Sequence, residues 1–98
     1  MNGFFTHKQF AILEALRDHG PLFGNEIAEK TGQWRPFVYS RTFDMVDWHC
    51  VEFTRESIPN TKVYRYRFYI THRGRNRLNE RTPSLLFRFL QGLFGDHA

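Results

Sequence analysis

Arginine side chains are the groups in this sequence whose type and placement most suggest chemistry. Residues 55–98 carry nine basic and three acidic side chains, whereas residues 1–54 carry five basic and seven acidic ones. All the basic residues of the second half except Lys62 are arginines, and a guanidinium can form two parallel hydrogen bonds with a phosphate or a base edge. This distribution predicts a polyanionic partner if the arginines lie on a binding element; otherwise it indicates a solvated basic surface.

The histidines and the single cysteine give little reason to expect a metal site or a catalytic centre. The histidines are His7, His19, His49, His72 and His97. They are scattered, and no two lie at ligand spacing on one expected element. The sequence also lacks a nucleophile motif, a phosphate-binding glycine loop and clustered carboxylates. We therefore predict no metal, no cofactor and no enzymatic activity.

The composition also bears on the compartment. Cys50, the only cysteine, cannot form an intrachain disulfide, which fits a reducing environment. The N-terminus lacks the basic-then-apolar pattern of a signal peptide, and no apolar run approaches the roughly 20 residues of a membrane span. These features predict a cytoplasmic protein without a membrane partner.

The positions that would hold the arginines depend on the order of helices and strands. Thr6 and Gln9 have capping-box spacing, and Phe5 and Phe10 have the spacing of a hydrophobic staple, so we expect a first helix over residues 6–19. Residues 22–23 are apolar after a proline and could form a short strand. A second, short helix is expected near residues 25–31 with Ile27 and Ala28 facing inward, and Gly32 ends it.

A third and longest helix is expected from Pro36 to about His49, because proline suits the first turn of a helix. Apolar residues spaced by four, three and four predict its inward face: Tyr39, Phe43, Val46 and Cys50. The opposite face would carry Phe37, Ser40, Arg41, Asp44 and Asp47.

After Cys50 the periodicity changes to two, which predicts a hairpin with strands near residues 51–55 and 62–71 and a turn at Pro59-Asn60. One face of the second strand is aromatic: Tyr64, Tyr66, Phe68 and Ile70. We expect this stripe to be core rather than a stacking platform for single-stranded nucleic acid. Thr71 can cap a following helix near residues 72–79, and residues 85–94 form a final, very apolar helical segment.

This order predicts an α+β fold: a winged helix–turn–helix with a three-helix core, a two-stranded β-wing and additional C-terminal helices. Residues 1–81 would form the DNA-binding domain and residues 82–98 an apolar C-terminal helix. In such a fold the helix near 36–49 enters the major groove, and the wing near 51–70 lies on the phosphate backbone.

Two segments resemble the PadR-like branch of winged-helix transcription regulators, and more loosely the MarR-like branch. Pro21–Ile27 (PLFGNEI) looks like the PadR-type pattern p-l-h-G-Y-E-I, and Arg67–Leu78 (RFYITHRGRNRL) looks like r-Y-y-L-T-x-x-G-r-x-x-L. The resemblance implies a transcription regulator that binds double-stranded DNA as a homodimer. The sequence departs from the family pattern at the end of the third helix, where His49-Cys50 replace the expected glycine.

Eight residues are the candidates for DNA contact: Arg35, Phe37, Ser40 and Arg41 on the recognition helix, and Arg55, Lys62, Arg65 and Arg67 on the wing. Arginine on the helix can read guanine, whereas the wing cations would meet phosphate. Each set has a structural alternative. Arg41 could pair with Asp44, and the wing cations could serve only to prevent aggregation of an edge strand. Asp44 and Asp47 would be repelled by phosphate.

The segment 85–94 is apolar around most of its circumference. We expect it to form a dimer interface through Leu85, Leu86, Phe89, Leu90 and Leu93. The alternatives are packing on its own domain, or a membrane-surface helix, for which the polar face has too few cations.

The sequence thus favours a small sequence-specific DNA-binding regulator. The alternative is a winged helix used as a protein-interaction module, and a third possibility is an accessory DNA binder without a regulatory role. An exposed patch of Trp34 and Phe37 would favour a protein partner, although these rings could also pack between helices or contact a thymine methyl group. The sequence identifies no small-molecule effector.

Overall fold

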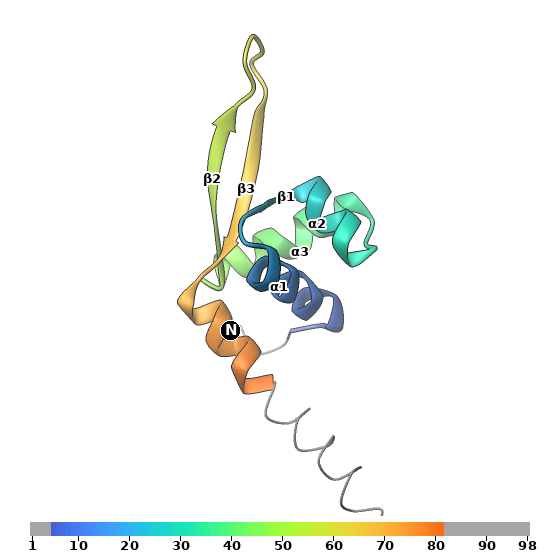
Figure 1. Ribbon diagram of the computed structural model, residues 1–98, viewed down its shortest axis with the longest axis vertical. Helices are drawn as coiled ribbons and strands as arrows, with labels where there is room; N and C mark the ends of the chain where they lie inside the picture. The colour runs from blue at the N-terminus through green and yellow to red at the C-terminus, as the bar shows by residue number, and fades with distance from the viewer. Residues whose placement is uncertain (1–4, 82–98) are drawn as a thin grey trace, which may run out of the picture.

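The computed structural model describes residues 5–81, in which four helices pack with a small sheet (Figure 1). The elements in chain order are α1 (His7–His19), β1 (Leu22–Phe23), α2 (Gly24–Thr31), α3 (Arg35–Asp47), β2 (Val51–Ser57) and β3 (Tyr64–Ile70). A further helix covers residues 72–81. The β2–β3 hairpin extends well beyond the helical body, whereas the helix at 72–81 lies beside α1 at the opposite end. The predicted dimerisation residues in 85–94 lie outside the described residues.

Local signals in the sequence fix the start of α1. The Thr6 hydroxyl accepts a hydrogen bond from the backbone N–H of Gln9 (3.2 Å), and the Gln9 side chain accepts one from the backbone N–H of Thr6 (3.0 Å). The Phe5 and Phe10 rings pack with their centroids 5.3 Å apart. The predicted capping box and hydrophobic staple are therefore confirmed, since both depend on neighbours within one helical turn.

The sheet has three antiparallel strands in the order β1-β3-β2. β2 pairs with β3 over seven residues, from Val51 opposite Ile70 to Ser57 opposite Tyr64. β1 adds only Leu22 opposite Phe68 and Phe23 opposite Arg67. The outer part of β3 therefore has a paired strand on one side only, and the short strand predicted at residues 22–23 is confirmed.

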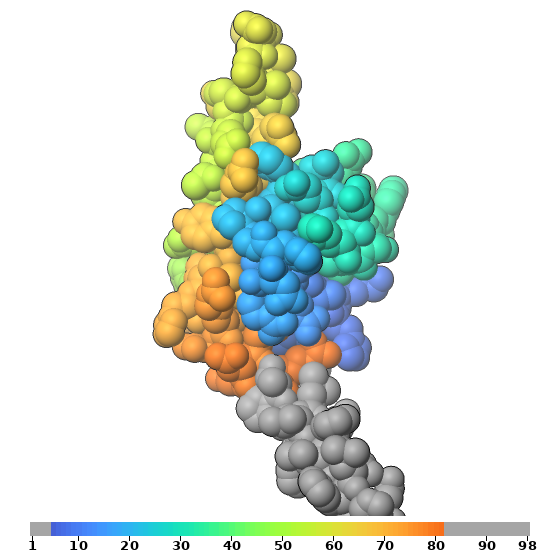
Figure 2. Space-filling model, viewed as in Figure 1, coloured from blue at the N-terminus to red at the C-terminus, as the bar shows by residue number. Residues whose placement is uncertain are grey.

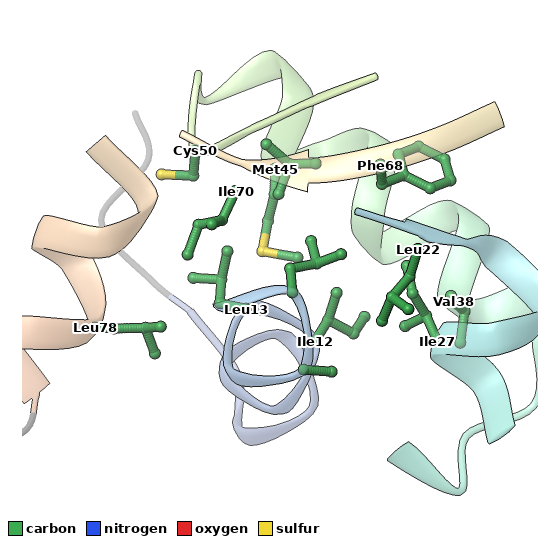
Figure 3. Close-up of a cluster of buried hydrophobic side chains, with 13 residues drawn as sticks. Ile12, Leu13, Leu22, Ile27, Val38, Met45, Cys50, Phe68, Ile70 and Leu78 are labelled. Carbon is green, nitrogen blue, oxygen red and sulfur yellow. The ribbon is translucent and has the colours of Figure 1, made fainter. Parts of the chain in front are cut away.

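The core lies where α1, α2 and α3 meet the inner half of the sheet (Figure 3). Ile12 and Leu13 of α1, Ile27 of α2 and Phe68 of β3 have no exposed surface. Leu78 of the last helix closes the cluster from the side of α1. The core is small, so single packing changes should have measurable effects on stability.

The inward face of α3 differs from the prediction. The fully buried line is Val38, Thr42 and Met45, whereas Tyr39 and Phe43 are half-buried on the flank that faces the sheet. The sequence pattern treated Thr42 as polar. Its hydroxyl donates to the backbone carbonyl of Val38 (2.6 Å), so the side chain is buried without an unsatisfied group.

Two other members of the predicted face also need correction. Val46 is half-buried, and Cys50 lies beyond the helix, buried in the turn that leads into β2. The helix ends at Asp47, two residues before the predicted end.

Gly24 and His49 each have a local structural explanation. The Tyr39 ring lies against Gly24 so closely that a Cβ at position 24 would stand 2.6 Å from Tyr39 Cε1. Gly24 thus allows α2 and α3 to approach. His49 has φ 63°, the left-handed conformation that a glycine would adopt without strain.

We expect His49→Gly to stabilise the fold by about 0.5–1 kcal/mol, because relief of the left-handed cost exceeds the entropy lost by adding a glycine. The backbone carbonyl of His49, which accepts from the Thr71 hydroxyl (2.7 Å), is retained. Thermal unfolding checks this. Asn60 also has positive φ (65°), but asparagine tolerates that region, so Asn60→Gly should give a smaller gain. Equal effects of the two substitutions would contradict the argument.

Candidate nucleic-acid interface

The predicted site residues lie on two elements, α3 and the β2–β3 hairpin. On α3, Arg35, Phe37 and Ser40 are exposed, and Arg41 is half-exposed. Asp44 and Asp47 are exposed nearer the C-terminal end of the helix. The cationic part of the α3 surface is therefore its N-terminal half.

Arg41 is held by a buried glutamine. Its Nη1 donates to Gln33 Oε1 (3.1 Å), and Gln33 Nε2 donates to the backbone carbonyl of Lys8 in α1 (2.9 Å). Gln33 is only 8% exposed. This chain of hydrogen bonds restricts the guanidinium before any ligand binds. The alternative partner Asp44 forms no ion pair with Arg41 among the described residues.

An aromatic pair stands at the start of α3. Trp34 is 68% exposed and Phe37 is 51% exposed, and their rings meet edge to face with centroids 5.3 Å apart. The Arg41 guanidinium lies over the Phe37 ring, 5.0 Å from its centroid. One alternative from the sequence is that the two rings pack between helices, but both rings are exposed.

The face of the hairpin that points away from α3 carries Arg65 and Arg67. Both guanidiniums stack on the Phe23 ring, at 3.7 Å and 4.3 Å from its centroid. Arg67 also forms an ion pair with Glu56 across the strands (2.8 Å). Arg67 is therefore partly neutralised, whereas Arg65 is exposed and, although Glu56 lies opposite it in the strand register, forms no ion pair among the described residues.

The face that points toward α3 is aromatic. The Phe43 ring of α3 packs edge to face against Phe53, Tyr66 and Phe68. The expectation that the whole stripe is core is wrong for Tyr64, its outermost residue, whereas Tyr66 packs against the core. Tyr66 is half-buried and Tyr64 is 49% exposed, because the hairpin extends beyond the helices that would have to cover it.

The outer end of the hairpin carries the remaining cations. The Arg55 guanidinium stacks over the Tyr64 ring (4.4 Å to the centroid), and exposed Lys62 lies in the turn. The turn is closed by the hydrogen bond from the Ile58 N–H to the Val63 carbonyl (3.0 Å). The basic residues thus lie on both faces and at the tip of the hairpin. Figure 2 shows this hairpin projecting from the body of the molecule.

The Cys50 thiol and the possible metal ligands show no arrangement for catalysis or metal binding among the described residues. Cys50 is buried and donates a weak hydrogen bond to the backbone carbonyl of Trp48 (3.7 Å). Burial raises the pKa of its thiol, against the opposite effect of Arg73 and Arg77. In residues 5–81, no group of three or more His, Cys, Asp or Glu side chains is placed to hold a metal ion. Over the same range no helix has the length and apolar character needed to cross a membrane.

No protein-family model matches the chain, and no curated protein is similar enough in sequence to match it. Solved structures do match. BpsR of Bordetella bronchiseptica aligns at TM-score 0.73 and 22% identity over 93% of this chain, and a MarR family transcriptional regulator from Silicibacter pomeroyi DSS at 0.70 and 18% over 91%. A PadR family transcription regulator from Clostridium difficile R20291 aligns at TM-score 0.73 and 14% identity over 94% of this chain.

The chain has the winged helix–turn–helix fold. It spans 66% and 56% of the first two proteins' own lengths and 98% of the PadR family protein. In this winged helix, α2 and α3 form the helix–turn–helix and the β2–β3 hairpin is the wing. The predicted α+β architecture is confirmed, with β1 as a third strand beside the two of the wing.

Two residues that matter to the site were missed by reasoning from the sequence. The Phe23 ring stacks with two of the three wing arginines, Arg65 and Arg67, and Gln33 accepts a hydrogen bond from Arg41. The role of Phe23 follows from the β1–β3 register, and that of Gln33 from the packing of α1 on the α2–α3 turn. Neither contact is a neighbour relation in sequence.

Proposed function

We propose that this protein is a small transcription regulator that binds double-stranded DNA sequence-specifically, with α3 in the major groove and the wing on the phosphate backbone. The observation that carries the proposal is the exposed set of wing cations on a projecting hairpin, above all Arg65. Phosphate contacts of this kind supply sequence-independent affinity, and side chains of a helix in the major groove supply discrimination.

The charges on α3 favour contact through its N-terminal half. Arg35 and Arg41 lie there, whereas Asp44 and Asp47 would be repelled by the phosphates if the other end of the helix lay close to a strand. Ser40, one turn after Pro36, can donate to or accept from a base edge.

The solved structures support the same function. The MarR and PadR family proteins are transcription regulators, and the BpsR structure concerns regulation of its DNA binding by 6-hydroxynicotinic acid. For this chain we infer DNA as the partner, a cytoplasmic location and no enzymatic activity.

A substitution on the wing provides the sharpest test of this proposal. Arg65→Ala is expected to weaken binding to every duplex and to shallow the slope of log K against log salt by about 0.9, the value of one phosphate contact. The ratio of specific to random affinity should stay unchanged, because a phosphate contact carries no sequence information. Fluorescence anisotropy with labelled duplexes over a salt series measures both quantities.

The paired arginine supplies the matched control. The double variant Arg67→Ala/Glu56→Gln removes the cation and the carboxylate together, so the net charge of the wing is unchanged. We expect its affinity to stay near the wild-type value, and its salt slope to match wild type. The variant loses the surface ion pair and the stacking of Arg67 on Phe23 (4.3 Å), each worth at most about 1 kcal/mol at an exposed site, so it should fold. Arg65→Ala with a wild-type slope would overturn the assignment of this residue to phosphate.

We further propose that the protein is a homodimer held by the apolar segment 85–94, because a domain of this size can hardly cover so many large apolar residues alone. Sedimentation of the full chain is expected to give a dimer at micromolar concentration. Deletion of residues 82–98 should give a monomer or an aggregate and weaker DNA binding through lost avidity. A full-length monomer under these conditions would contradict the proposal.

A protein-interaction module is the second candidate, and the exposure of Trp34 and Phe37 is the observation in its favour. Exposed aromatic residues are common at interface hot spots. This alternative predicts no binding to any duplex, even at low salt.

A further inference from the structure

Trp34 and Phe37 form an exposed apolar patch in an otherwise polar and charged part of the α3 surface. Both side chains keep more than half of their surface in solvent. Neither ring is needed to fill the core, whose α3 members are Val38, Thr42 and Met45. Two adjacent exposed rings form a contiguous apolar patch, which is a candidate binding surface.

The patch is held in a fixed geometry. The backbone carbonyl of Trp34 accepts from the N–H groups of Phe37 (3.0 Å) and Val38 (3.1 Å), which fixes the first turn of α3. The two rings pack edge to face, and the Arg41 guanidinium covers Phe37. Arg41 is itself held by buried Gln33. The apolar rings and the cation are therefore preorganised side by side.

We propose that Trp34 and Phe37 contact thymine C5-methyl groups in the major groove, and that Arg41 beside them contacts a neighbouring guanine. The thymine methyl is the apolar group that a base pair presents in this groove, and guanine presents the O6 and N7 acceptors that an arginine fork fits. The inference rests on the proposed DNA binding and assigns sequence preference to this patch.

The position of the patch favours DNA over a protein partner. It lies at the N-terminal end of the helix that would enter the groove, with Arg35 and Arg41 close in sequence and no acidic residue between Gly32 and Thr42. Two rings are also a small part of the roughly 800 Å² per partner that a stable protein interface buries.

The test compares thymine with deoxyuridine, which lacks only the methyl group. A duplex is first selected from a random library with the full-length wild-type protein, and its thymines are then replaced one at a time. We expect at least one replacement to weaken wild-type binding about fourfold, the value of one buried methyl group. Phe37→Ala or Trp34→Ala should bind the thymine and deoxyuridine forms of that position equally.

Tyr64→Ala provides the matched control, because Tyr64 is an exposed aromatic residue on the wing rather than on α3. It should keep the wild-type ratio between the two duplexes. Phe37→Leu, which keeps an apolar side chain, should retain part of the ratio. Circular dichroism confirms that each variant is folded.

Three results would overturn the inference while leaving DNA binding intact: equal wild-type affinity for thymine and deoxyuridine at every position, full discrimination by both alanine variants, or failure of the selection to enrich any sequence. Wild-type DNA binding by both alanine variants together with altered self-association in sedimentation would assign the patch to a protein partner. Failure of the wild-type protein to bind random duplex at low salt would instead refute the proposed function.

Discussion

Replacement of Gly74 by alanine is expected to lower the free energy of unfolding by about 2–3 kcal/mol, as in an overpacked core. A Cβ at this position would collide with the backbone carbonyl oxygen of Cys50 and stand 2.8 Å from Ile70 Cγ1. The carbonyl cannot move freely, because it accepts the N–H of Thr71 (3.0 Å). The helix at 72–81 would have to separate from the start of β2.

The sign of this effect is informative. Gly74 is helical, and an unhindered glycine-to-alanine change in a helix stabilises by about 1 kcal/mol. A loss of stability therefore reports the collision rather than helix propensity. Asn76→Ala on the same helix is exposed and should be neutral or slightly stabilising. Chemical denaturation measures the free energy of unfolding of both variants. A Gly74→Ala protein as stable as wild type would contradict the close contact between Gly74 and the Cys50 carbonyl.

Replacement of Arg41 by alanine is expected to reduce the ratio of specific to random DNA affinity by about 5- to 150-fold, which corresponds to the 1–3 kcal/mol of one good base contact. Binding should cost less side-chain entropy at Arg41, because Gln33 already restricts the guanidinium in the free protein. Binding to random duplex should change much less. The measurement is a competition of the selected site against random duplex at one salt concentration.

Arg17→Ala is the control for the loss of a positive charge. Arg17 is exposed on α1, which is part of neither α3 nor the wing, and pairs with Asp18 (2.8 Å). It should leave the affinity ratio unchanged. If Arg41→Ala also leaves that ratio unchanged, Arg41 contributes to structure through Gln33 and not to base recognition.

The sequence predicted those parts of the fold that depend on near neighbours. The capping box of α1, the left-handed end of α2 at Gly32 and the Thr71 cap, whose hydroxyl accepts the N–H of Gly74 (3.1 Å), are all contacts within a few residues. The alternation of β3 also placed Phe68 correctly in the core. Such signals need no knowledge of the tertiary structure.

The errors arise where tertiary packing decides. Thr42 is buried because its hydroxyl finds a carbonyl within its own helix, which periodicity alone does not reveal. Tyr64 is exposed because the hairpin extends beyond the helices that cover its inner half. The pairing of Arg67 with Glu56, and the stacking of Arg65 and Arg67 on Phe23, require the strand register. The sequence could therefore identify the cations of the wing but not which of them is free to meet a phosphate.

We propose that α3 and the wing together bind duplex DNA. This proposal is tested most directly by the affinity of the full-length wild-type protein for a random duplex as a function of salt. Arg35, Arg55, Lys62 and Arg65 are exposed cations of α3 and the wing without an ion pair among the described residues, and Arg65 lies on the wing face that points away from α3. Contact of three or four of them with phosphate predicts binding at low salt and a log–log slope of about −3 to −4 per protomer. Absence of binding at low salt, or a slope near zero, would contradict the account.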